Sequence, residues 1–295
     1  MEHCRERRGR AGILGLALAT AMLFGAPRAF AGPNSGLVQF NFGSDFTTAY
    51  FFRGILQERA GFIWQPHGEV DVNLYKEEGA GLSGVTLFVG SWNSIQSEKT
   101  LSRGGGTGPG NWYESDFYSG FKFTLLDTVE IKPFYYLYMY PNGAFPSVQE
   151  MNVAVSLFDA QWLGAFALNP SVLMAWEFDN TTLGTKPGTY AEVDINPNFV
   201  IYQDDTYPVN LAIPMQVGMS VSDYYESPTT GRDNSFGFFK AGLTFSVPLG
   251  FIPEEYGSWS VAAGPAVYAF GTNLKEINKG NNPWVVGTAS LNFSY

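Results

Sequence analysis

The sequence predicts an all-β fold, a transmembrane antiparallel β-barrel of about twelve strands. Three features of the chain point to it. The chain ends in an alternating strand whose final residue is aromatic, it begins with an export-type segment, and it has no long apolar run after that segment. Strands that are apolar on one face and close into a ring are one of the few ways to cross a bilayer, because no backbone edge is then left open.

The closing segment, residues 284–295, alternates with a period of two. In a barrel this last strand pairs with the first, and an aromatic end lies in an interfacial girdle. A terminal aromatic also resembles the signal that the bacterial barrel-assembly machinery binds, so that machinery is an expected partner through Tyr295. For this segment alone, an edge strand of a soluble sandwich is the alternative. One face carries Val285, Gly287, Ala289, Leu291, Phe293 and Tyr295.

The amino-terminal segment, residues 1–31, is predicted to be a secretory signal peptide. Arg5, Arg7, Arg8 and Arg10 form a charged start, and an apolar run from residue 13 to 24 follows. The segment ends on Ala29-Phe30-Ala31, an A-x-A cleavage pattern. Residues 32–295 are then the mature barrel, exported through the periplasm to the outer membrane of a Gram-negative cell.

Composition narrows the function classes of the mature chain. Five of the 17 Lys and Arg and two of the 27 Asp and Glu lie in residues 1–31, which leaves 12 minus 25, a formal net charge of −13. This acidic balance argues against a nucleic-acid partner. The single cysteine, Cys4, leaves with the signal peptide, so no disulfide or thiolate metal site is expected. Aromatic residues make up 16% of the chain, which suits strands that face lipid on one side.

Twelve alternating segments follow in order, each long enough to cross a bilayer as a tilted strand. In the second, polar Gln65, His67 and Glu69 alternate with apolar residues, and the fourth and fifth repeat this pattern around Glu114 and Glu130. Charged and amide side chains therefore share one face, opposite a Leu, Val, Ile and Phe stripe. The predicted strands are residues 37–52, 63–75, 82–92, 112–126, 129–140, 148–159, 167–178, 189–202, 209–222, 236–247, 258–270 and 284–295.

The predicted connections alternate in length. Those after odd strands are mostly longer and rich in Gly, Asn, Pro and Ser, as expected for extracellular loops, with residues 53–62 and 93–111 among them. Those after even strands, such as residues 76–81 and 127–128, are mostly short periplasmic turns. Strand boundaries obtained from sequence are uncertain by about two to four residues, so ten or fourteen strands remain open.

Part of the chain resembles a known family. The runs SDFTTAYFFRGILQ (44–57), GFIWQPHGEVDVNLY (61–75), FVGSWNS (88–94) and WYESDFYSGFKF (112–123) are similar to the TorF-type porin family. The resemblance covers residues 44–125 and is thin afterwards, and this chain is longer in its carboxyl-terminal half. It implies an outer-membrane barrel and little chemistry.

Two candidate sites have structural alternatives. His67, Glu69 and Asp71 share a strand face, and an acid–His pair can act as a general base. However, no serine lies beside the histidine on that face, and with no second histidine in the mature chain a metal site of the usual kind is not expected. These residues are interpreted as a solvated wall. Arg53, before Gly54, is either a solute-binding arginine or the partner of a carboxylate near the barrel mouth.

Other motifs have plain explanations. The Gly-rich run SRGGGTGPGN (102–111) falls between two strands, so it is interpreted as an extracellular loop rather than a phosphate-binding turn. The tyrosines of residues 135–140 and the aromatic pair at 112–113 could stack solutes, but interfacial girdle residues are the commoner case.

The function expected from these observations is a porin-like channel for passive diffusion of small solutes, without enzymatic activity or a cofactor, surrounded by outer-membrane lipids. A plugged structural or adhesion barrel and a barrel enzyme are the alternatives. Acids outnumber bases on the polar face, so cation preference is expected. The predicted lumen residues are Asp45, Arg53, His67, Glu69, Asp71, Glu114, Asp116, Lys122, Glu130, Lys132, Glu150, Glu177, Glu192, Asp194 and Lys240.

Overall fold

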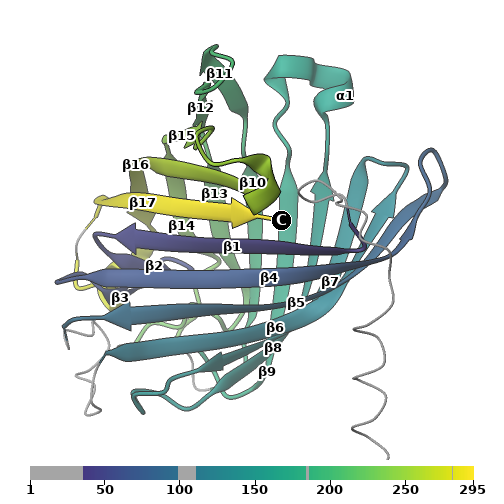
Figure 1. The fold of residues 1–295 in the computed structure, drawn as a ribbon. Coiled ribbons are helices and arrows are strands. Elements are labelled where there is room, and N and C mark those ends of the chain that lie inside the picture. Colours follow the sequence, from purple (N-terminus) through teal and green to yellow (C-terminus); the bar gives the residue numbers. More distant parts are fainter. Residues whose placement is uncertain (1–35, 99–110, 184–185, 281) are drawn as a thin grey trace, which may run out of the picture. The chain divides into compact units, whose positions relative to one another are not determined.

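The computed structural model describes residues 36–98, 111–183, 186–280 and 282–295, and residues 32–295 belong to one compact unit. The wall of this unit is a single antiparallel β-sheet closed on itself (Figure 1). Its strands are β1 (Val38–Thr47), β4 (Ile63–Lys76), β5 (Leu82–Gln96), β6 (Trp112–Leu125), β7 (Val129–Met139), β8 (Val148–Leu157), β9 (Ser171–Asp179), β10 (Thr189–Ile195), β11 (Asn198–Tyr202), β12 (Val209–Ala212), β13 (Met215–Ser222), β14 (Phe236–Gly242), β15 (Thr244–Pro248), β16 (Ser258–Phe270) and β17 (Trp284–Ser294).

These fifteen segments make twelve wall strands, because three strands are each interrupted once. β10 and β11 are two halves of one strand, as are β12 and β13, and β14 and β15, since each half pairs with the same neighbouring strand or its continuation. The prediction of an antiparallel barrel of about twelve strands is therefore confirmed. The single unbroken strands predicted over residues 189–202, 209–222 and 236–247 are wrong in this detail.

Two of the three interruptions contain a proline, which has no backbone N–H to donate to a neighbouring strand, and the third falls at Leu243. Pro197 and Pro214 separate the halves of two strands that are neighbours in the sheet, and Pro265 lies in the next strand but one. Their carbonyl oxygens still accept hydrogen bonds, from Ile213 N, Gly242 N and Leu243 N respectively, at 2.9 Å each. The prolines thus form a row across the wall, and each keeps one backbone hydrogen bond through its carbonyl oxygen.

The barrel closes through the carboxyl-terminal strand β17. It pairs with β1 on one side, with Phe293 opposite Phe42, and with β16 on the other, with Phe293 opposite Trp259. The terminal residue extends this closure, because Tyr295 and Phe40 exchange two backbone hydrogen bonds of 2.6 and 2.8 Å. The first and last strands of the wall are therefore joined directly, and the ring is closed.

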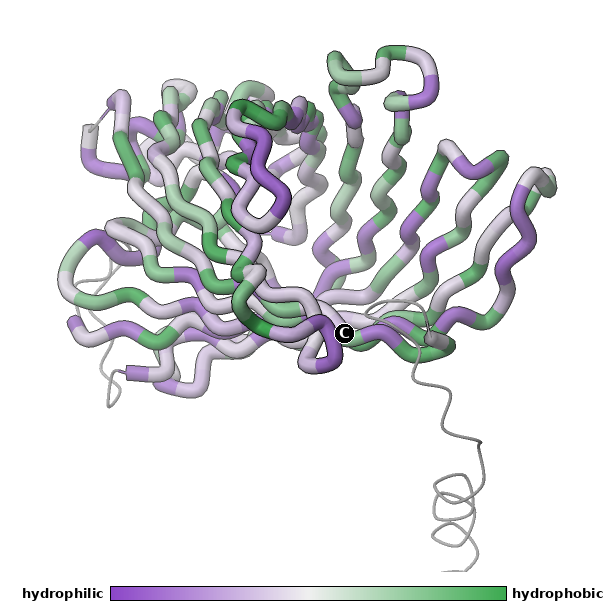
Figure 2. The backbone as a smooth tube through the Cα atoms, turned by 45° about the horizontal axis from the view of Figure 1, so that its top comes forward, coloured by the Kyte–Doolittle hydropathy of each residue, from purple (hydrophilic) through white to green (hydrophobic). Residues whose placement is uncertain are grey.

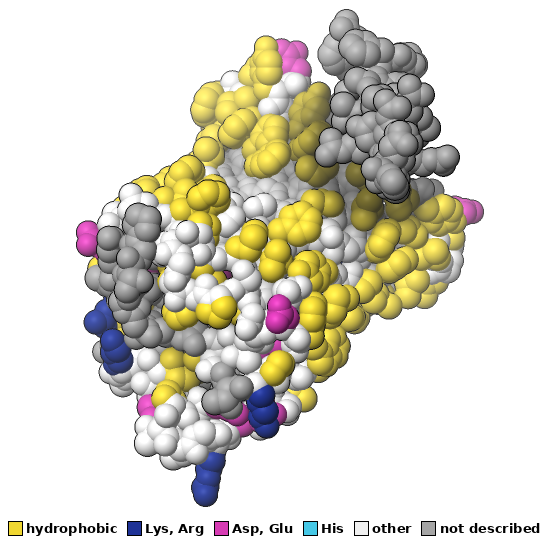
Figure 3. All heavy atoms as spheres, turned by 90° about the horizontal axis from the view of Figure 1, so that it is seen from below, with side chains coloured by type: hydrophobic (Ala, Val, Ile, Leu, Met, Phe, Trp, Pro, Cys, Tyr) yellow, Lys and Arg dark blue, Asp and Glu magenta, His cyan; other side chains and the backbone are white. Residues whose placement is uncertain are grey.

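The outer face of the wall carries the large apolar side chains. Phe40, Phe117, Phe121, Met151 and Val267 are among the exposed hydrophobic residues, and each lies at an alternate position along its strand. Figure 2 shows hydrophobic and hydrophilic residues alternating along the strands. Figure 3 shows hydrophobic side chains gathered over much of one face, while the Lys and Arg side chains visible there lie toward one end.

The helices are short and lie in the connections. They are α1 (Ala160–Leu163) and the 3-10 turn η1 (Gly164–Phe166) between β8 and β9, the 3-10 turn η2 (Glu254–Tyr256) before β16, and α2 (Thr272–Ile277) between β16 and β17. Within the residues that the structure describes, no helix combines the length and the apolar character needed to cross a membrane.

The first predicted strand is confirmed over residues 38–47 but ends earlier than expected, and the loop predicted after it is wrong. The strand expected over residues 37–52 leaves the wall at Thr47, and residues 50–58 form a separate hairpin of β2 (Tyr50–Phe52) and β3 (Ile55–Glu58). The physical reason is the largely apolar segment from Tyr50 to Leu56, which is buried or half-buried against inward-facing residues of the wall and against α2 instead of facing lipid or solvent.

Candidate functional site

The β2–β3 hairpin lies inside the ring of strands. Its residues contact side chains of β6, β8, β10 and the end of α2, which belong to widely separated parts of the barrel, so the hairpin crosses the space that these strands enclose. Arg53 and Gly54 form its turn, with φ angles of 46° and 76°. Positive φ at both central residues is the signature of the type I′ turn that joins tightly twisted hairpins.

Two apolar clusters hold the hairpin from different sides. In the first, Ile55 and Leu56, which are 0% and 2% exposed, pack with Phe238 and Leu274 of the wall and α2. In the second, Tyr50 packs with Ile63 and Tyr113. Burial of this kind contributes about 25 cal/mol per Å² of apolar surface. The hairpin is therefore a packed element and not a loose loop.

Asn278, just after α2, binds the hairpin backbone. Its side-chain oxygen accepts a hydrogen bond from Leu56 N at 2.9 Å, and its amide nitrogen donates to Gly54 O at 2.8 Å. Tyr225 donates to Arg53 O at 2.8 Å. Because buried backbone groups need partners, these three bonds replace the water that the hairpin gives up.

The Arg53 guanidinium is enclosed by a group of residues that we call the Arg53 cage: Glu150, Tyr138, Tyr190 and Tyr224. Two parallel hydrogen bonds of 2.7 and 2.9 Å join it to the Glu150 carboxylate, and a third of 2.9 Å reaches the Tyr224 hydroxyl. Tyr138 donates to Glu150 at 3.0 Å. The Arg53 and Glu150 side chains are 8% and 0% exposed, so the ion pair is shielded from solvent.

Aromatic rings complete the cage. The guanidinium carbon lies 4.4 Å from the ring centre of Tyr190, 5.0 Å from Phe52 and 5.4 Å from Tyr224. These distances fall within the range of cation–π attraction. Of the two possibilities for Arg53, the structure shows the pairing with an interior carboxylate.

A pair of acids lies beside the hairpin on β6. Tyr50 donates to Glu114 at 2.8 Å, and Tyr136 donates to Asp116 at 3.2 Å. Tyr113 donates to Gln57 at 2.6 Å. Four buried side-chain atoms in the described residues have no hydrogen-bond partner: Gln65 Nε2, Glu114 Oε1, Asp116 Oδ1 and Asn152 Nδ2.

A second charged group links β4, β6 and β7. Lys122 donates to Glu69 at 2.6 Å and to Asp71 at 2.8 Å, and Lys132 lies 3.5 Å from Glu69. Lys132 also lies 4.1 Å from the ring centre of Phe88. The two lysines balance the two carboxylates in formal charge.

His67 and Asp45 come together less closely. The distance between His67 Nδ1 and Asp45 Oδ2 is 3.8 Å, whereas Glu69, the other acid near this histidine, is bound to lysine. This separation is longer than a hydrogen bond, for which about 2.6–3.2 Å between the heavy atoms is usual.

The remaining predicted residues lie on the same inner face. Glu177 of β9 accepts bonds from Thr182 N and Gly188 N, at 2.7 and 2.9 Å. Tyr190 donates to Glu192. Asp194 and Lys240 lie on β10 and β14 at positions that both pair with Gln216 of β13, and Glu130 of β7 is opposite Ser156.

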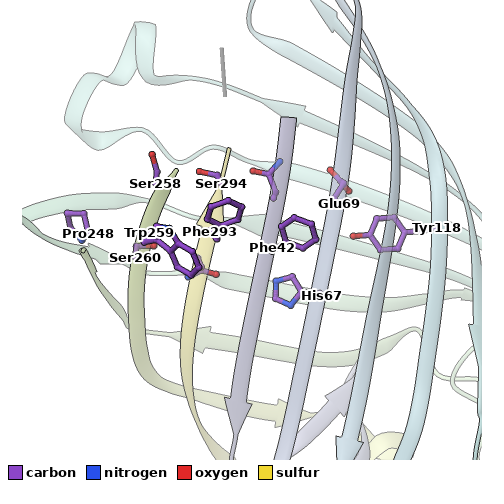
Figure 4. Close-up of a pocket in the computed structure, with 12 residues that line it drawn as sticks. Phe42, His67, Glu69, Tyr118, Pro248, Ser258, Trp259, Ser260, Phe293 and Ser294 are labelled. Carbon is purple, nitrogen blue, oxygen red and sulfur yellow. The ribbon is translucent and has the colours of Figure 1, made fainter. Parts of the chain in front are cut away.

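A cavity of about 500 Å³ lies along the wall where the barrel closes. Its polar lining includes His67, Glu69 and Tyr118 (Figure 4). Figure 4 also shows Phe42, Phe293 and Trp259 next to one another on three neighbouring strands, where the ring centres of Phe42 and Phe293 are 6.1 Å apart and those of Trp259 and Phe293 are 4.7 Å apart. The cavity is thus lined by polar groups of β4 and β6 together with aromatic rings of the closing strands.

Three acids and a lysine in the connections have shifted pKa values. Hydrogen bonds from Tyr207 N and Thr206 N lower the pKa of Asp204. The bond from Thr229 lowers that of Glu276. Bonds with Ser222 and then Lys186 lower the pKa of Asp223, and the Asp223 partner raises that of Lys186. These groups keep their ordinary charges near neutral pH.

The sequence analysis placed Glu114 and Glu150 on the inner face but missed other residues that bind Arg53 and the hairpin, among them Tyr224 and Asn278. Tyr224 and Asn278 lie in connections that were expected to be outward loops, and neither stands out among the polar residues around it. The adjacent tyrosines at 224 and 225 were the available signal, because two neighbouring aromatic side chains are seldom both left exposed to water in a loop. The described residues contain no group of three or more His, Cys, Asp or Glu placed to hold a metal.

Comparison with known proteins finds similarity of structure only. No family model matches the chain, and no curated protein matches it in sequence. Similar solved structures include a NanC porin, with 11% identity and a TM-score of 0.42 over 86% of this chain and 98% of that one. An outer membrane channel from Pseudomonas putida F1 has 10% identity and a TM-score of 0.43 over 92% and 99%. LpxR from Salmonella typhimurium has 8% identity and a TM-score of 0.40 over 86% and 99%.

Because these TM-scores are below 0.5, the barrel assignment rests on the strand pairings and not on the likenesses. The resemblance to the TorF-type porin family over residues 44–125 stays a prediction, since no family model matches.

Proposed function

We propose that this protein is an outer-membrane, porin-like channel for passive diffusion of small solutes, narrowed by the β2–β3 hairpin. The observation that carries the proposal is the two-sided wall: a closed ring of twelve strands with large apolar side chains exposed on one face and charged or amide side chains on the other. A polar interior surrounded by an apolar band is the arrangement of membrane channels built from strands.

The proposal includes export and location. Residues 1–31 act as a signal peptide, the mature chain crosses the periplasm, and the barrel-assembly machinery binds the strand that ends in Tyr295. The closure of β17 on β1 supports this last step, because the terminal residue is itself bonded to Phe40 in the closing pair. Outer-membrane lipids then cover the exposed apolar face.

Cation preference belongs to the same proposal. Three of the four bases that the sequence predicted for the lumen are paired: Arg53 with Glu150, Lys122 with Glu69 and Asp71, and Lys132 with Glu69. That leaves a surplus of acids on the inner face, and rings of Asp and Glu favour cations in a pore. The acids outside these ion pairs are Asp45, Glu114, Asp116, Glu130, Glu177, Glu192 and Asp194.

A plugged barrel without transport is the second candidate, and the packing of the hairpin favours it. Apolar clusters contact the hairpin from two sides, and Glu114 and Asp116 beside it are buried. Enzymatic activity is not proposed, because Glu69 is engaged by lysine and His67 lies 3.8 Å from Asp45.

The test is current across a planar bilayer that contains the purified, heat-modifiable protein. The channel proposal predicts discrete small openings. In a KCl gradient, it predicts a reversal potential of the sign that cation preference gives. Anion preference would contradict the proposed lining. Absence of openings from correctly folded protein would favour the plugged barrel.

A further inference from the structure

The turn of the hairpin has an unfavourable residue type at its first central position. A type I′ turn needs positive φ at both central residues, a conformation that Gly and Asn adopt most readily. Here the first position holds Arg53 at φ 46°, followed by Gly54 at 76°. A long, charged, unfavoured residue kept at such a position suggests that its side chain is what matters.

The side chain fills a site with the features of a receptor for a planar cation. The Glu150 carboxylate presents two oxygens to two guanidinium nitrogens at 2.7 and 2.9 Å, the geometry that distinguishes guanidinium from a point charge. Rings of Tyr190 and Tyr224 lie 4.4 and 5.4 Å from the guanidinium carbon. Carboxylate and aromatic faces together are also how cationic ligands are recognised.

The surroundings add negative charge that Arg53 does not balance. Glu177 lies opposite Glu150 in the β8–β9 pair, and Tyr190, a ring of the cage, donates its hydroxyl to Glu192. One internal cation therefore sits among several carboxylates. A second cation entering this region is attracted rather than repelled.

We propose that the Arg53 cage is a recognition site for guanidinium-bearing solutes, and that Arg53 occupies it as an internal substitute. The inference rests on the proposed channel function and names its substrate class. A solute of this kind competes with Arg53 for Glu150. The hairpin keeps its other anchors, Asn278 on Leu56 and Gly54 and Tyr113 on Gln57, so the cage can exchange its occupant while the hairpin base stays bound.

The experiment empties the cage without straining the turn. Arg53→Gly suits φ 46° and removes the side chain, and Arg53→Asn is a second variant that also suits this conformation. The double variant Arg53→Gly with Glu150→Gln is the matched control, since the introduced amide oxygen can still accept the bond from Tyr138 but carries no charge. Purified protein in detergent is titrated calorimetrically with N-ethylguanidinium, and with uncharged N-ethylurea as control. Heat-modifiable mobility verifies folding of each variant.

The expected result is one site on the Arg53→Gly protein that binds N-ethylguanidinium about tenfold or more tightly than the double variant does, because a hydrogen-bonded charge is lost. The wild-type protein should bind N-ethylguanidinium more weakly than the Arg53→Gly protein does, because its own arginine occupies the cage. Equal binding by the double variant, or equal binding of N-ethylurea, would overturn the proposal. This binding measurement is independent of channel current. If the protein binds N-ethylguanidinium but conducts no ions, only the proposed channel function is refuted. If it conducts ions but does not bind N-ethylguanidinium, only the proposed recognition site is refuted.

Discussion

Asn278→Ala should weaken the attachment of the β2–β3 hairpin to the interior of the barrel. The substitution removes both side-chain bonds to the hairpin, leaving Leu56 N and Gly54 O buried without these partners. An unsatisfied buried backbone group costs about 1–3 kcal/mol, so two cost about 2–6 kcal/mol. Even about 2 kcal/mol raises the ratio of open to closed hairpin by about 30-fold.

Hydrogen exchange at the Leu56 amide, followed by mass spectrometry of the folded protein, measures this ratio directly. Asn273→Ala is the matched control, because Asn273 lies in the same connection and donates to Tyr225 O and Arg232 O but not to the hairpin. We expect exchange of peptides covering Ile55–Glu58 to accelerate by about 30-fold or more in Asn278→Ala and to change little in Asn273→Ala. Equal exchange in the two variants would refute the view that Asn278 holds the hairpin.

Three further outcomes follow from the chain termini and the longest loop. Intact-mass analysis of outer-membrane material should give a chain that starts at Gly32, and retention of residues 1–31 would refute the signal peptide. Tyr295→Asp should lower the amount of heat-modifiable barrel, because a charge replaces an aromatic ring at the closing pair with Phe40; a normal amount of barrel would count against a role of Tyr295 in assembly. An epitope inserted after Gly106, which lies outside the described residues, should be labelled on intact cells, whereas labelling only after permeabilisation would invert the proposed topology.

The sequence predicted the wall well because each strand carries its own signal. Alternation through Gln65, His67 and Glu69 places these residues on one face whatever the neighbours are, since the side-chain period of a strand is two. The closing strand was equally clear, as its stripe runs to Tyr295 without interruption.

The hairpin could not be predicted in the same way. Residues 50–52 continue the alternation of β1, so nothing local marks the point where the chain leaves the wall at Thr47. Its position depends on contacts with Tyr224 and Asn278, which are 171 and 222 residues away from their hairpin partners. The interruptions at Pro197 and Pro214 were visible as residues, but their alignment in one row depends on register, which a single sequence does not fix.

Removal of the hairpin tests the central proposal of a channel that this element narrows. Phe46 is opposite Trp64 in the β1–β4 pair, so Thr47 and Ile63 are neighbours across the strands, and residues 48–62 can be replaced by Asn-Gly, the preferred type I′ pair. The measurement is single-channel conductance of this variant and of wild type in the same bilayer and salt. We predict small openings for wild type and openings severalfold larger for the variant. Equal conductance from two correctly folded proteins would contradict the proposal, because the hairpin would then not be what limits the flow.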